Sequence, residues 1–139
     1  MSQKRNWTVN NCQEIEQRIE DMLSTISIFK KSIENANERN KISFKKISEL
    51  ESEAFVLKEK FIDLNGISYE DAIVHVESSK NPDSEFNLEQ FNLIKSIEDS
   101  ISGERFFVYQ REKLISKNQK IIVDISERIL ELEKKKKAL

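Results

Sequence analysis

An apolar stripe from Ile15 to Leu64 constrains the fold of this 139-residue chain more than any other feature. Alternating steps of four and three residues along it meet polar side chains only at Asn40 and Ser43. A period of 3.5 residues held over seven heptads predicts a helix that packs along a partner helix. The members of the stripe are Ile15, Ile19, Met22, Ile26, Phe29, Ile33, Ala36, Asn40, Ser43, Ile47, Leu50, Ala54, Leu57, Phe61 and Leu64.

A second stripe with the same spacing runs from Ile94 to Leu132 and predicts a second long helix. Its members are Ile94, Ile97, Ile101, Glu104, Val108, Arg111, Ile115, Asn118, Ile122, Ile125, Ile129 and Leu132. A flanking column is expected to widen this stripe, and it consists of Leu93, Phe107, Leu114 and Ile121. Both stripes must be buried away from water, so the two helices are predicted to pack against each other as an antiparallel hairpin. A parallel dimer through the first helix is the alternative.

Local signals bound the first helix, which is expected at about residues 11–64. Asn11 can accept a free amide of the first turn, and residues 1–10 are expected to be frayed. Asn65-Gly66 ends the helix, because Gly readily adopts the left-handed conformation found there.

A short helix at about 68–79 and a long one at about 84–137 are expected next. Ser68 can cap the short helix, whose apolar face would contain Ile67, Ile73 and Val76. Pro82 marks the turn, and Asp83 or Ser84 can cap the long helix. Gly103 weakens that helix by about 1 kcal/mol relative to Ala, so a bend or break is expected there.

These signals predict a single all-α domain over residues 1–139. It would be a long antiparallel two-helix coiled-coil hairpin with a short extra helix near the turn. The composition agrees, because 35% of the residues are charged and only two Gly and one Pro occur.

The sequence offers no pattern typical of an enzyme or of a cofactor site. It has no Gly-rich phosphate loop, nucleophile elbow or dinucleotide fingerprint, and its carboxylates recur at the spacing of a solvated helix face. His75 has no second ligand at a metal-site spacing, and Cys12 is the only cysteine. We therefore expect no catalysis, cofactor, metal or small-molecule substrate. No apolar run reaches the ~20 residues of a membrane span, so a cytoplasmic protein without membrane insertion is expected.

Two asparagines interrupt the stripes. A buried Asn costs stability but fixes the register of paired helices, and this is the interpretation favoured for Asn40 and Asn118. The interpretation favoured alongside it is a sideways step of the stripe onto Ile42 and Phe44. A loose segment in which the helices bend or exchange partners is the alternative.

Four bulky residues in succession, Phe106-Phe107-Val108-Tyr109, cannot all face one seam. Together with Arg105, Arg111 and Trp7, the aromatic members Phe106, Phe107 and Tyr109 are candidates for a partner-binding hot spot, which is typically rich in aromatic and Arg side chains. The alternative is that the 68–79 helix folds back and covers them.

The chain has an acidic middle and a basic C-terminal segment. Residues 67–104 contain two basic and nine acidic residues, whereas residues 105–139 contain ten and five. The segment ends in Lys134, Lys135, Lys136 and Lys137, which either compensate the helix dipole or steer the chain toward an acidic protein surface. A nucleic-acid site would need more basic residues with interleaved aromatics, so this function is disfavoured.

Taken together, the chain resembles the short central-stalk proteins of type III export systems, flagellar and virulence-associated. The resemblance rests on the length, the two long stripes and the capped segment Ser68-Tyr69-Glu70-Asp71 between them. It implies that the paired chain ends enter the ring of a hexameric export ATPase at a membrane-bound secretion machine. It also implies contact with the export gate and with secretion chaperones. A generic coiled-coil scaffold, an assembly factor or an escort chaperone is the alternative.

Overall fold

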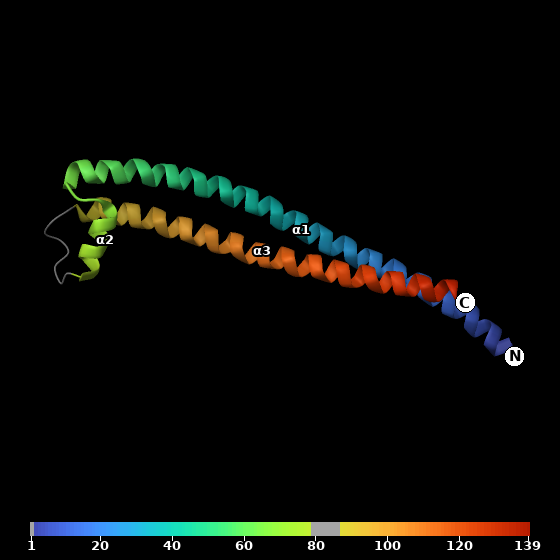
Figure 1. The fold of residues 1–139 in the computed structure, drawn as a ribbon. Coiled ribbons are helices and arrows are strands. Elements are labelled where there is room, and N and C mark those ends of the chain that lie inside the picture. Colours follow the sequence, from blue (N-terminus) through green and yellow to red (C-terminus); the bar gives the residue numbers. More distant parts are fainter. Residues whose placement is uncertain (1, 79–86) are drawn as a thin grey trace. The chain divides into compact units, whose positions relative to one another are not determined.

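The computed structural model describes the backbone of residues 2–78 and 87–139, and the side chains of residues 11–77 and 87–139. Within these ranges the chain forms helices α1 (Ser2–Asn65), α2 (Tyr69–Ser78) and α3 (Leu88–Lys137), without a strand (Figure 1). It divides into two compact units: unit 1 contains Met1–Arg39 and Gln110–Leu139, and unit 2 contains Asn40–Tyr109.

Each unit pairs a segment of α1 with a segment of α3 in antiparallel order. In unit 2, Lys46 pairs with Glu104 at 3.2 Å, and Lys58, further along α1, pairs with the earlier Glu98 at 2.8 Å. In unit 1, Lys136 near the end of α3 pairs with Glu16 at 2.7 Å. The predicted all-α hairpin, with a short helix between its long helices, is therefore confirmed, and α1 packs against α3 of its own chain.

Burial follows the two predicted stripes closely. Every member of the first stripe from Ile15 to Phe61 is buried or half-buried, and so are all members from Ile94 to Leu132 on α3. Leu64, at the end of the first stripe, is instead 68% exposed. The 3.5-residue period therefore identified the seam of the hairpin.

The predicted widening of the second stripe is wrong for three of its four residues. Leu93, Phe107 and Leu114 are exposed, and only Ile121 is half-buried. A seam between two helices covers the positions that face the partner helix. Flanking positions become buried only where further cover is present.

The helix starts differ from the predicted ones. α1 begins at Ser2 rather than at Asn11, since neither Gly nor Pro occurs in residues 2–10 to interrupt a helix. α3 begins at Leu88, where the Asn87 side-chain oxygen accepts the amide of Gln90 at 3.1 Å. The expected caps of this helix, residues 83 and 84, lie outside the described part of the chain.

The connection from α1 to α2 has the predicted geometry. Gly66 has φ = 69°, and its amide donates to the carbonyl of Ile62 at 2.8 Å. The Ser68 hydroxyl then accepts the amide of Asp71 at 3.1 Å and caps α2. The left-handed Gly therefore ends α1, and Ser68 starts the next helix.

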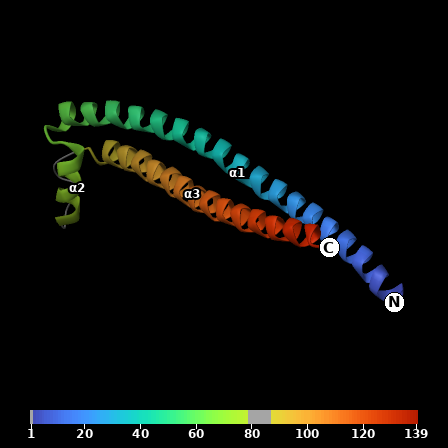
Figure 2. The same ribbon diagram turned by 45° about the vertical axis from the view of Figure 1, so that its right-hand side comes forward.

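In unit 2, α2 packs against the last turns of α1 and the first turns of α3 (Figure 2). Tyr69 lies at the centre of this cluster, with its ring 6.3 Å from that of Phe61 and 5.2 Å from that of Phe91. Ala72 and Ile94 are the other buried members, and the predicted apolar face of α2 packs around the cluster.

The two glycines provide a matched test of backbone conformation. A Cβ at Gly103 or at Gly66 would meet no atom within 4 Å, but only Gly66 has a positive φ. α3 runs through Gly103 without the predicted break. Gly103→Ala should therefore raise the free energy of unfolding by about 1 kcal/mol. Gly66→Ala should lower it by roughly 1–2 kcal/mol. Urea denaturation followed by circular dichroism measures both changes, and equal shifts would contradict this account.

Candidate partner-binding surfaces

The three aromatic side chains Phe106, Phe107 and Tyr109 lie on one turn of α3 in unit 2, and we call them the aromatic turn. They are 56%, 52% and 51% exposed, whereas Val108 among them is buried in the seam. The two Phe rings stack edge to face, with their centroids 6.1 Å apart. The sequence prediction that these residues exceed what one seam can bury is therefore confirmed.

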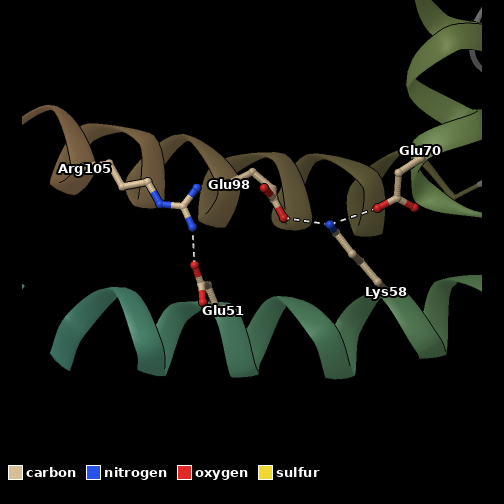
Figure 3. A network of polar contacts seen from close by, with 5 residues as sticks. All are labelled: Glu51, Lys58, Glu70, Glu98 and Arg105. Atoms are coloured by element: carbon tan, nitrogen blue, oxygen red, sulfur yellow. Dashed lines mark hydrogen bonds and ion pairs between the residues drawn. The ribbon is translucent and has the colours of Figure 1, made fainter. Parts of the chain in front are cut away.

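Polar contacts hold the start of this turn against α1. Glu104 is mostly buried and pairs with Lys46 at 3.2 Å. The next residue, Arg105, pairs with Glu51 (Figure 3). Val108 anchors the turn from the seam side. These three ties fix the orientation of the turn, so that the aromatic rings face outward. Arg105 thus pairs within unit 2, and its part in partner binding stays a prediction.

The short helix does not cover the aromatic turn. α2 packs its buried residues Tyr69 and Ala72 against Phe61, Phe91 and Ile94. The alternative that the 68–79 helix folds back over Phe106–Tyr109 is therefore wrong. Tyr69, which periodicity alone did not mark as a core residue, selects the other site because its ring fits between Phe61 and Phe91.

Lys58 joins all three helices of unit 2 (Figure 3). Its ammonium lies 2.8 Å from Glu98 on α3 and 3.0 Å from Glu70 on α2, and 5.3 Å from the centre of the Tyr69 ring. Burial lowers the pKa of Lys58, but the hydrogen bonds with Glu98 and Glu70 outweigh it, so the pKa lies above 10.5. Burial also raises the pKa of Tyr69. Sequence reasoning missed this network, since its members are far apart in the chain.

Asn65 ties the end of α1 to the start of α3. Its side-chain amide donates to the carbonyl of Phe61 at 2.9 Å and to Gln90 at 3.2 Å. Its side-chain oxygen accepts the amide of Asn87 at 2.8 Å. The pair Asn65-Gly66 reads in the sequence only as a stop signal, yet Asn65 also positions the next long helix.

The predicted register residues are both buried: Asn40 is 6% and Asn118 4% exposed. The Asn118 amide donates to the Ser32 hydroxyl at 3.2 Å, and every buried side-chain nitrogen or oxygen in the described part of the chain has a hydrogen-bond partner. Ile42 and Phe44 are 69% and 53% exposed, so the proposed sideways step of the stripe is wrong. The register role itself stays a prediction.

The last turn of α3 in unit 1 contains four exposed lysines, Lys134, Lys135, Lys136 and Lys137, and we call it the basic turn. Lys136 pairs with Glu16 of α1 at 2.7 Å, and this hydrogen bond raises the pKa of Lys136. Lys136 therefore helps to close the hairpin, whereas the other three lysines extend the basic surface around it.

Arg111 and Trp7 are the remaining candidates for partner binding. Arg111 is half-buried at its seam position in unit 1. The backbone of Trp7 belongs to α1, but its side chain lies outside the described residues. The association of Trp7 with the aromatic turn therefore stays a prediction.

The described residues also bear on metal binding and on membrane insertion. No group of three or more His, Cys, Asp or Glu side chains there is arranged to hold a metal ion. No described helix is long and apolar enough to cross a membrane.

Comparisons with known proteins give no relative for this chain. Neither a protein-family model, nor a curated protein, nor a solved structure matches it.

The ion pair between Glu70 and Lys58 predicts a pH-dependent stability. The Lys58 hydrogen bond holds the pKa of Glu70 below its usual 4.5. Glu70 should therefore contribute stability above pH 4.5, which is lost as the pH falls through the lower, folded-state pKa. Glu70→Gln should lower the free energy of unfolding at pH 7 by at most about 1 kcal/mol, because the carboxylate is largely exposed.

This difference should disappear in acid, which urea denaturation at pH 7 and pH 3 can measure. Glu59→Gln, at another exposed carboxylate of unit 2, is the matched control and should change stability little at either pH. A Glu70→Gln effect that persists at pH 3 would show that the ion pair is not its cause.

Proposed function

We propose that this protein is a non-enzymatic coiled-coil interaction protein, which binds a protein partner through the aromatic turn. The observation that carries the proposal is the half exposure of Phe106, Phe107 and Tyr109 on one turn. Aromatic residues are enriched among the few residues that contribute most of the binding energy at protein interfaces. The ties through Glu104, Arg105 and Val108 support the proposal, because a surface ordered before binding loses less entropy on association.

Within this class we propose the central stalk, or adaptor, of a type III export ATPase. Two features support this role: a hairpin of two long helices, and the exposed lysines in the last turn of α3. In this proposal the basic turn enters the hexameric ring and binds an acidic surface of the ATPase there. The aromatic turn then meets the export gate or a secretion chaperone.

A generic scaffold, assembly factor or escort chaperone is the runner-up. It would use the aromatic turn in the same way but would not need the basic turn. The two roles therefore separate when the two surfaces are changed one at a time.

We expect the triple variant Phe106→Ser, Phe107→Ser and Tyr109→Ser to weaken partner binding by about a hundredfold or more, because it removes the residues that would contribute most of the binding energy. Helix content should stay unchanged, since all three side chains face outward. The control Val123→Ser with Leu130→Ser removes equally exposed apolar side chains from unit 1 and should leave binding intact. Calorimetry with a partner recovered from the native cell measures both. Equal losses in the two variants would contradict the proposal.

Reversal of the basic turn tests the stalk role. The variant Lys134→Glu, Lys135→Glu and Lys137→Glu keeps Lys136 and its ion pair with Glu16. Co-purification of a hexameric ATPase should be lost in this variant, and wild-type binding should weaken as salt is added.

A second triple variant carries the same change of charge at exposed lysines elsewhere: Lys45→Glu, Lys117→Glu and Lys120→Glu. ATPase binding should survive in this control. Retention of the ATPase by both triple variants would favour the scaffold role.

A further inference from the structure

Unit 1 contains a groove of about 430 Å³ between α1 and α3, which Arg111 borders from its seam position. Its apolar wall includes Ile28 and Leu114, which are 69% and 42% exposed. Lys31, Arg39 and Arg111 supply the charge. We call these five residues the basic groove.

The sign of this charge distinguishes the basic groove from the groove around Tyr69 in unit 2. Its lining contains three cationic side chains and no carboxylate. By contrast, the groove around Tyr69 in unit 2 is lined by Glu70, Glu77, Glu98 and Asp99 as well as two lysines. Unit 1 as a whole has 15 basic and 11 acidic residues, and unit 2 has 8 and 14. The chemistry that fits the basic groove is therefore an acidic helix with an exposed apolar side chain.

The chain itself carries such a helix in α2. The exposed face of α2 holds Asp71, Val74 and Glu77, which recur at three-residue spacing, whereas Glu70 pairs with Lys58 of its own unit. Val74 is 64% exposed at the centre of these carboxylates. The opposite face, with Tyr69 and Ala72, is buried in unit 2. The exposed face of α2 thus matches the basic groove in charge and in apolar character.

We propose that a second copy of this chain occupies the basic groove through its α2. In this contact Val74 of one copy lies against Ile28 and Leu114 of the other, and Asp71 and Glu77 face Lys31 and Arg39. A two-fold dimer would contain the contact twice. The inference does not depend on the proposed function, because it uses neither the aromatic turn nor the basic turn.

A contact through one face of the ten-residue α2 is small, so the dissociation constant should be on the order of micromolar. Sedimentation equilibrium of the wild-type chain should show a shift from one copy to two across the micromolar range. Added salt should move that shift to higher concentration, since charge pairs at an exposed interface are screened.

Charge reversal identifies the surfaces involved. Lys31→Glu with Arg39→Glu in the groove, or Asp71→Lys with Glu77→Lys on α2, should each weaken dimerisation roughly tenfold or more. The chain that combines both pairs of reversals should dimerise again, because the complementarity is restored with its signs exchanged. All four side chains are exposed, and circular dichroism checks that each variant keeps its helices. The control Lys45→Glu with Glu59→Lys, at exposed positions on α1 outside both surfaces, should dimerise like the wild type.

Three results would overturn the proposal. The first is a sedimentation mass equal to that of one copy at all concentrations. This result counts against the proposal even if the groove binds an added acidic peptide, because the groove would then bind another protein. The second is a dimer that both pairs of reversals leave unchanged. The third is a combined variant that stays as weak as the single pairs. A dimer that is lost only in the triple Ser variant of the aromatic turn belongs to the second case.

Discussion

Burial of the apolar stripe of α1 beneath α3 holds the helices of this protein together. Each Ile or Phe side chain removed from water contributes about 1.5–3 kcal/mol, whereas a solvated helix gains little from its own hydrogen bonds. The seam is only two helices wide, so it covers the stripe positions and little else. As a consequence, large apolar residues such as Phe55 and Phe106 stay on the outer faces of the helices. The same constraint that stabilises the fold leaves apolar side chains for contacts with other molecules.

Polar contacts add to the seam in holding the helices of unit 2 together. Glu104 and Arg105 bind α1 from the turn that precedes the aromatic residues, and Lys58 connects α1 to both other helices. Asn65 holds the start of α3. Each contact adds modest stability where it is exposed. In unit 2 they also join α3 to α1 at the turn that carries Phe106.

The two units carry opposite charge and different surfaces. Unit 2 is acidic and presents the aromatic turn and the outer face of α2, and unit 1 is basic and presents a groove and a lysine-rich helix end. The proposed functions follow this division. An aromatic surface suits a protein partner, whereas opposite charges on two units of one chain suit association between copies or with a charged ring. Each surface consists of a few side chains that can be changed without opening the seam.

The sequence by itself determined the seam, because burial between two helices repeats with the same 3.5-residue period as the apolar residues. It also determined the left-handed turn at Gly66 and the cap at Ser68, which depend on local conformational preference alone. Only the tertiary structure decided where α2 packs, since Tyr69 finds Phe61 and Phe91 through contacts that no local pattern encodes. It likewise decided that Leu93 and Phe107 stay exposed, because burial of a flanking position requires a neighbour whose presence the period does not reveal.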